Sequence, residues 1–251
     1  MNRRHTAIAT GKSQALIIYL IDVSGSMKDK FETAQKIDYV NQALENMLTV
    51  MVQRSMRGEV ISPRYRIAMA AYDHTVTDIL DGVRDINWLV EKGNPTLLPS
   101  RGTTETALAF RWARDLLRAE LPAMKGCPAP MICHLTDAEF TGEDPQPIAE
   151  EIMAMGNDDG AVLIENIFMA PGLTRDPIGD LGRWKGVSRD QLSSDYGRKL
   201  CDMSSSLPET YARMMASEGY ALEAGRPMLI PGSDSNLIEL AFTLGGITGA
   251  G

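Results

Sequence analysis

Residues 15–21 read ALIIYLI, an uninterrupted apolar run of strand length. A strand that is apolar on both faces is typical of the centre of a parallel sheet covered by helices on both sides. Parallel neighbours require long crossover connections, which are usually helices. The run therefore predicts an α/β fold. It leads directly into DVSGS, which places Asp22, Ser24 and Ser26 at the carboxyl end of a central strand.

The periodicity of apolar residues predicts the other elements of this fold. We expect strands at residues 65–71, 75–80, 131–136, 161–170 and 227–230, and helices at residues 31–51, 106–120, 148–155, 207–218 and 236–244. The strand at 75–80 follows a turn at Asp73 and His74, so it runs antiparallel to the strand before it. The expected fold is a doubly wound (Rossmann-like), mostly parallel central sheet with one antiparallel edge strand and helices on both faces.

Length and composition favour one domain. A chain of 251 residues with 44% apolar content can bury one sizeable core. We expect a polar N-terminal arm over residues 1–14 and a single domain over residues 15–251, with an irregular connection at about 171–190 and C-terminal helices within about 207–244. The net charge of −8 argues against nucleic acid or an anionic membrane surface as a partner.

The polar N-terminal segment and the lengths of the apolar runs favour a cytoplasmic protein. Residues 1–14 are polar where a signal peptide needs an apolar core, and no apolar run approaches the roughly 20 residues that span a bilayer. Cys127, Cys133 and Cys201 are odd in number and lack Cys-x-x-Cys spacing, so they suggest neither a disulfide framework nor a zinc site. We expect reduced cysteines in or near the core.

Three polar segments should meet at one edge of the sheet, because loops at the carboxyl ends of parallel strands form the functional crevice of such folds. They are residues 22–26, residues 101–104 ahead of the second helix, and Thr136-Asp137 after the strand at 131–136. Together they offer two carboxylates and several hydroxyls. An inventory of oxygen atoms suits a small hard cation such as Mg²⁺, which takes roughly six ligands, usually including waters.

The segment DVSGS is similar to the Asp-x-Ser-x-Ser signature of von Willebrand factor A (vWA) domains, which carry a metal site called MIDAS. The resemblance implies that Asp22, Ser24 and Ser26 help to bind Mg²⁺ or Mn²⁺. The segment RGTTETALAF resembles the threonine loop of the family and implies Thr104 as a ligand, or Thr103 if the register shifts by one residue. Asp137 matches the last ligand, in a Thr-Asp-Ala segment where the family usually has Thr-Asp-Gly.

The resemblance also implies a function. The chain looks most like stand-alone vWA proteins of the bacterial cytosol, some of which belong to tellurium-resistance clusters. Such a domain would use its divalent cation to capture an acidic residue, Asp or Glu, of a partner protein in a stress-response or signalling complex. No catalysis is required for this role. No oligomeric state follows from the sequence.

Other interpretations of the same residues remain. Asp22, Ser24 or Ser26 could simply cap a helix beginning near Met27. Asp22 could serve a Mg²⁺-dependent phosphotransferase of the haloacid dehalogenase kind, although Ser24 stands where such enzymes have their second acid. Ser24 could be a hydrolase nucleophile assisted by His74 or His134, but DVSGS lacks the Gly-x-Ser-x-Gly elbow. His134, inside a predicted strand, is expected to face the core or to form a local hydrogen bond.

Overall fold

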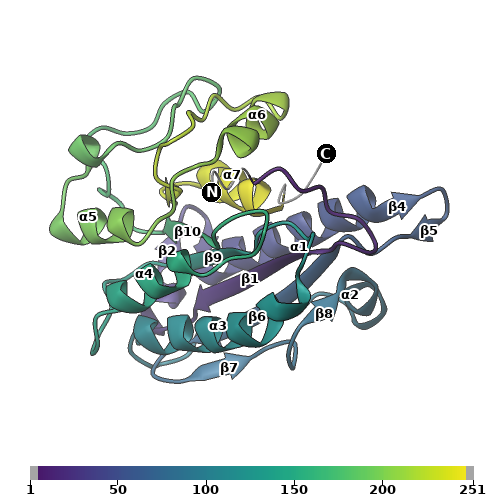
Figure 1. Ribbon diagram of the computed structural model, residues 1–251. Helices are drawn as coiled ribbons and strands as arrows, with labels where there is room; N and C mark the ends of the chain where they lie inside the picture. Colours follow the sequence, from purple (N-terminus) through teal and green to yellow (C-terminus); the bar gives the residue numbers. More distant parts are fainter. Residues whose placement is uncertain (1–4, 247–251) are drawn as a thin grey trace.

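The computed structural model describes residues 5–246 and contains the predicted central sheet. Its strand order is β11-β10-β9-β1-β6-β7, with β8 also paired to β6 (Figure 1). The parallel strands are β1 (Ala15–Asp22), β6 (Tyr65–Tyr72), β9 (Met131–Thr136), β10 (Leu163–Phe168) and β11 (Leu229–Pro231). The short strands β7 (Val76–Asp78) and β8 (Arg84–Asp85) run antiparallel to β6 and form the edge. The predicted fold class is confirmed.

Helices cover both faces of the sheet (Figure 1). They are α1 (Lys36–Ser55), α2 (Ile86–Lys92), α3 (Thr106–Glu120), α4 (Gln146–Ala154), α5 (Asp195–Asp202), α6 (Glu209–Ser217) and α7 (Ser235–Gly246). Alternate residues of β1 point to opposite faces, as strand geometry requires. Ile17 and Tyr19 belong to the apolar core shared with α1 and α7, whereas Leu16 and Ile18 belong to the core shared with α3 and α4. Every residue of β1 is buried, which explains its continuous apolar sequence.

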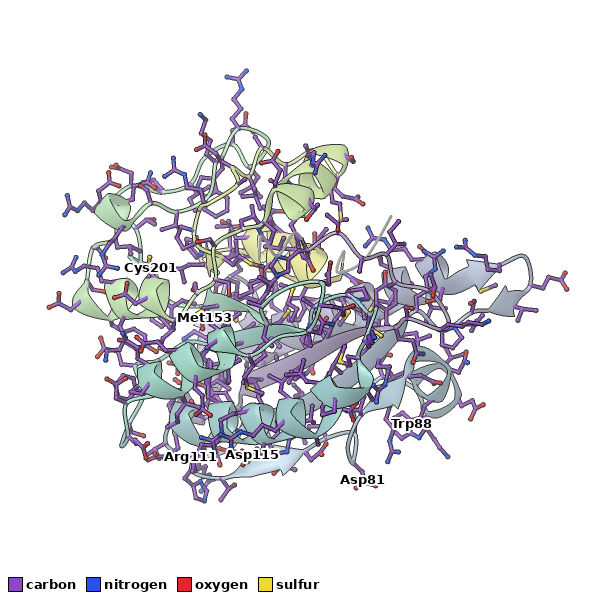
Figure 2. The ribbon with its side chains drawn as sticks, in the orientation of Figure 1. Asp81, Trp88, Arg111, Asp115, Met153 and Cys201 are labelled. Atoms are coloured by element: carbon purple, nitrogen blue, oxygen red, sulfur yellow. The ribbon has the colours of Figure 1, made fainter. Side chains whose placement is uncertain are left out.

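The segment after β10, with α5 and α6, forms the upper part of Figure 1. Residues 171–188 contain no helix and end at the short 3-10 turn Arg189–Gln191. Charged residues line the outer part of α3, including the labelled Arg111 and Asp115 (Figure 2). Among the residues described, no helix is both long enough and apolar enough to cross a membrane.

One predicted element is wrong at its beginning. Residues 31–35 were expected in the long helix, but β2 (Lys30–Phe31) and β3 (Ala34–Gln35) form an antiparallel hairpin, and α1 begins only at Lys36. Glu32 adopts a left-handed backbone conformation, with φ of 47°, which a helix cannot contain. Gln35 and Asp38 then make a reciprocal capping box that fixes the start of α1.

Several short elements were not predicted. They are α2, α5 and the hairpin of β4 (Met56–Arg57) and β5 (Val60–Ile61). The arm was predicted as polar, yet its described part packs against the domain. The backbone N–H groups of Thr6 and Ala7 donate to Asp159 Oδ1 at 2.7 and 2.8 Å, and Ala9 is buried. Cys127, Cys133 and Cys201 are free thiols, the first two buried.

A hydrogen-bonded network crosses the core beneath the carboxyl end of β1. Tyr72 Oη lies 2.7 Å from His134 Nε2, and His134 Nδ1 lies 2.7 Å from Asn166 Oδ1. The Asn166 amide group donates to the Met203 carbonyl oxygen at 3.1 Å and to Ser204 Oγ at 2.9 Å. Burial lowers the pKa of His134 to about 4, so this imidazole is neutral at pH 7. The prediction that His134 faces the core is confirmed.

Candidate metal centre

The candidate site lies where the winding of the sheet reverses. Starting from β1, the chain crosses to β6 on one side and later to β9 on the other, so β1 is the switch point of the sheet. Open α/β sheets bind their ligands in the crevice outside the carboxyl ends of the strands at such a point. Asp22 ends β1 and Thr136 ends β9, so both lie at the carboxyl ends of neighbouring strands.

The first and third polar segments are joined by side-chain hydrogen bonds. Asp22 accepts the backbone N–H of Ser24 on Oδ1 and the Thr136 hydroxyl on Oδ2, both at 2.7 Å. The hydroxyl oxygens of Ser24 and Ser26 lie 3.2 Å apart, and the Ser26 hydroxyl donates to Asp137 Oδ1 at 2.7 Å. The structure therefore brings four of the five predicted ligands into one hydrogen-bonded cluster.

The second segment reaches the same cluster through its backbone. The N–H of Ser100 donates to the Val23 carbonyl oxygen at 2.6 Å, and the N–H of Gly25 donates to the Gly102 carbonyl oxygen at 3.2 Å. Thr104 is buried and Thr103 is exposed. The assignment of Thr104 rather than Thr103 as the ligand stays a prediction.

Asp22 is held in an environment that resists negative charge. Its side chain is fully buried, and this desolvation raises its pKa to about 6, although hydrogen bonds from Thr136 and Ser24 act in the opposite direction. The nearby Asp137 carboxylate raises the pKa of Asp22 further. A cation placed beside Asp22 would favour the ionised form of this acid.

Two contributors were missed by the sequence interpretation. Thr136 was noted only as part of the Thr-Asp-Ala segment, yet its hydroxyl is the donor that fixes Asp22 Oδ2. Lys36 lies with its Nζ 2.5 Å from Asp137 Oδ2, and its side chain is only 13% exposed. Lys36 was not recognised as a site residue because residues 31–35 were interpreted as helix. A helix there would have placed Lys36 away from the site.

The helix-capping interpretation does not describe these residues. The segment Gly25–Lys28 is a 3-10 turn with Ser24 at its N-cap position, but no side chain caps it. Asp22 instead accepts an N–H within its own loop and a hydroxyl from β9. A residue that only capped a turn would not need the second contact.

The donor set fits a hard divalent cation. Apart from Lys36, the side chains that converge here have oxygen as their only polar atoms. Their two carboxylates are enough to offset the charge of one divalent ion. Within residues 5–246 no three His, Cys, Asp or Glu side chains gather as a metal-binding group, so a cation here would depend on hydroxyls and waters to complete its shell.

No protein-family model matches the chain, and no curated protein matches it either. Several solved structures are similar to this chain in fold. The minor pilin PilB of Streptococcus sanguinis has a TM-score of 0.56 at 10% identity, over 92% of this chain and 60% of the pilin. Proximal thread matrix protein 1 of the mussel byssus, with a zinc-occupied MIDAS motif, has a TM-score of 0.54 at 15% identity, over 92% of this chain and 46% of that protein.

The fold is vWA-like. An aerotolerance-related membrane protein of Bacteroides fragilis also superposes, with a TM-score of 0.51 at 14% identity, over 91% of this chain and 96% of that one. The chain spans about half the length of the pilin and the matrix protein that it matches. At these identities the similarity establishes the fold, and the site has to be argued from its own residues.

Proposed function

We propose that this protein is a divalent-cation-dependent interaction module that captures an acidic residue of a partner protein. Ser24, Ser26 and Thr104 would ligate Mg²⁺ or Mn²⁺ directly, and Asp22 and Asp137 would ligate it directly or through water. A cation held in this way supplies a positive centre whose remaining position accepts an Asp or Glu carboxylate. The vWA-like fold and the zinc-occupied MIDAS motif of one similar structure support the proposal.

The observation that carries the proposal is the cross-connection of β1 and β9 by hydroxyls and carboxylates. Each contact joins residues more than a hundred positions apart, the Ser26 hydroxyl to Asp137 and the Thr136 hydroxyl to Asp22. Each donor hydroxyl holds one carboxylate oxygen in place. The orientation of the carboxylate group is therefore fixed before any ligand binds. A set of oxygen atoms held in this way is preorganised for a cation.

The chemistry of the donors favours Mg²⁺ or Mn²⁺ over zinc. Zinc in proteins is bound mostly by cysteine and histidine, whereas carboxylate, hydroxyl and water oxygens suit magnesium and manganese. The described site contains no sulfur or imidazole ligand. We therefore propose magnesium or manganese here, although the similar matrix protein holds zinc.

A binding role accounts for the burial of the site residues better than a catalytic one. A phosphotransferase would need the Asp22 carboxylate free to attack a phosphorus atom, but Asp22 is fully buried and both of its oxygens accept hydrogen bonds. A serine hydrolase would need a histidine base beside Ser24, but His134 bonds Tyr72 and Asn166, and His74 Nδ1 lies 3.1 Å from Asp73 Oδ2. We therefore propose no catalytic step.

A cytoplasmic location and a bacterial stress-response or signalling role remain predictions from the sequence. The similar structures include a minor pilin, a byssus matrix protein and a membrane protein, so they do not favour one compartment. The acidic residue of the partner is also a proposal.

Calorimetric titration with Mg²⁺ and with Mn²⁺ tests the cation site. Asp137→Asn should lower the affinity at least a hundredfold, because it removes one of only two carboxylates. Glu139→Gln is the matched control, since it removes an exposed acid two positions along the same segment and should bind as the parent does. Equal binding by Asp137→Asn and the parent would place the cation elsewhere.

Capture of the partner is tested by retention from native lysate with Mg²⁺ and release by chelator. The parent and Glu139→Gln should retain the same protein, and Asp137→Asn should not. Replacing single acidic residues of the retained protein should then abolish capture at one position. Retention that survives both chelation and Asp137→Asn would contradict a metal-dependent mode.

A further inference from the structure

Lys36 forms an ion pair with the acid that the proposed cation needs. Its ammonium nitrogen lies 2.5 Å from Asp137 Oδ2, while Asp137 Oδ1 accepts the hydroxyl of Ser26. The Asp137 side chain is fully buried and that of Lys36 is 13% exposed. Both carboxylate oxygens of Asp137 therefore already have partners, and one of these partners is a positive charge.

The β2–β3 hairpin puts Lys36 in this position. The backbone N–H of Lys36 donates to the Asp29 carbonyl oxygen at 3.1 Å, so residues 29–36 close into a loop. Because the loop returns to its starting point, Lys36 stands beside the 3-10 turn Gly25–Lys28 that carries Ser26. The hairpin residues 30–35 thus deliver a lysine to the metal loop that a direct connection into α1 would not place there.

Nothing in the helix itself favours a lysine at this point. Lys36 is the first residue of α1, where the helix dipole is positive and disfavours a cation. The capping groups of α1 are Gln35 and Asp38, and they do not involve the Lys36 side chain. The contact with Asp137 is therefore the interaction that holds the ammonium group inward.

The charges of the cluster set up a competition. Asp22 and Asp137 supply two acids, and Lys36 supplies one positive charge. A divalent ion added beside an unmoved Lys36 would bring the positive total to three against two carboxylates. Like charges a few ångströms apart repel strongly where water is scarce. The divalent cation and the ammonium group of Lys36 therefore cannot both contact Asp137 without strong repulsion between them.

We propose that Lys36 is a built-in competitor of the divalent cation. Its ammonium group neutralises Asp137 while the cation is absent and leaves for solvent when the cation binds. The inference rests on the cation site proposed above and adds to it a reason for weak, exchangeable binding. A chain with this lysine would hold its cation firmly only when the carboxylate of a partner adds the missing negative charge.

Substitution of Lys36 tests the competition by titration with Mg²⁺ and Mn²⁺ at fixed ionic strength. Lys36→Met removes the charge and keeps the chain length, and we expect it to bind either ion at least tenfold more tightly than the parent. Lys36→Arg keeps the charge and should remain within threefold of the parent. Lys28→Met is the matched control, because Lys28 is an exposed lysine of the same segment. It should change the affinity less than twofold.

The unmodified protein offers a second readout. An amine-acetylating reagent followed by mass spectrometry reports how accessible each lysine is. We expect Lys36 to react slowly with chelator present and at least fivefold faster with saturating Mg²⁺. Lys28 and Lys30, which are exposed, should react at unchanged rates. If Lys36→Met does not fold, this measurement and Lys36→Gln still decide the question.

The outcomes separate this inference from the proposed function. Cation binding by the parent that is not tightened in Lys36→Met, or is tightened equally in Lys28→Met, overturns the competition and leaves the cation site intact. Binding by Lys36→Met but not by the parent supports it. Absence of binding in the parent, Lys36→Met and Lys36→Gln overturns both proposals, because there is then no cation with which to compete.

Discussion

Two buried polar clusters lie next to each other in this molecule and differ in how their groups are paired. In the network of Tyr72, His134 and Asn166 the members are neutral, and they bond to one another and to nearby backbone. In the cluster of Asp22, Ser26 and Asp137, each of the two acids accepts a hydroxyl, and only Asp137 is also paired with a lysine. The neutral network therefore satisfies its hydrogen-bonding groups without any external ligand. The acidic cluster keeps a surplus of negative charge that an external cation can use.

The difference separates stability from binding. A closed neutral network contributes to the free energy of folding, because breaking it leaves buried groups without partners. An acidic cluster contributes less when empty, because desolvation of its carboxylates opposes their pairing. Substitutions in the neutral network should therefore lower stability and leave cation binding nearly unchanged, and substitutions in the acidic cluster should do the reverse. The following experiments test that separation in order of decreasing expected effect.

The largest effect is expected from the closed network. His134→Leu should lower the free energy of unfolding by about 3 kcal/mol, since it removes the imidazole that Tyr72 Oη and Asn166 Oδ1 both contact in the core. Urea unfolding measures the loss, and Mg²⁺ affinity should stay within threefold of the parent. His74→Leu is the control, because His74 is largely exposed and should change stability little. A loss of cation binding equal to that of Asp137→Asn would mean that the two clusters are not separate.

The pH dependence of stability gives an effect of similar size. The pKa of His134 is about 4 in the folded chain, below the ordinary value of 6.5, so the unfolded chain binds more protons between these values. Stability from this group is complete above pH 6.5 and falls by about 3 kcal/mol as the pH drops to 4. Burial raises the pKa of Asp22 to about 6, which opposes this fall over the same pH range. Urea unfolding in chelator at both pH values should therefore show that the stability of the parent falls by about 3 kcal/mol more than the stability of His134→Leu. An unchanged fall would assign it to other groups.

A smaller effect is expected from Ser26, which belongs to the acidic cluster. Ser26→Ala removes one proposed ligand and the donor to Asp137 Oδ1, so Mg²⁺ affinity should fall about tenfold, or about 1.4 kcal/mol. Stability in chelator should change by no more than about 1 kcal/mol. Calorimetric titration and urea unfolding give the two numbers. A loss of stability without a loss of Mg²⁺ binding would mean that Ser26 stabilises the fold and does not bind the cation.

The smallest effect concerns the threonine loop. Thr104→Ala should weaken Mg²⁺ binding several-fold, whereas Thr103→Ala should leave it unchanged, since Thr104 is buried and Thr103 is exposed. Each variant is the control for the other. The reverse ranking would shift the ligand by one residue and leave the rest of the site as proposed.

The sequence predicted the sheet and three converging loops because their signals are local. Apolar runs show where β1 and β9 end, and polar residues directly after them lie at the functional edge of an α/β sheet. The strand pairing itself decides what those residues touch. That Thr136 donates to Asp22 depends on β1 and β9 being neighbours, which no periodicity reveals.

Lys36 could not be found in the same way. Phe31 and Ala34 match the apolar spacing of α1, but the left-handed conformation of Glu32 and the capping by Gln35 end that pattern. Instead of joining the helix, Phe31 packs edge-on against Tyr39. The helix α5 was missed for a related reason, because Gly197 within it weakens its helix propensity.

The hydrogen bonds that build the site join residues 111 and 114 positions apart. The site therefore comes into being only after β9 has paired with β1, which requires the intervening chain to have been laid down. A cation that binds this arrangement binds the folded chain alone and shifts the folding equilibrium, by about 1.4 kcal/mol at ten times its dissociation constant. A partner of the kind proposed would consequently meet only molecules in which β9 has paired with β1.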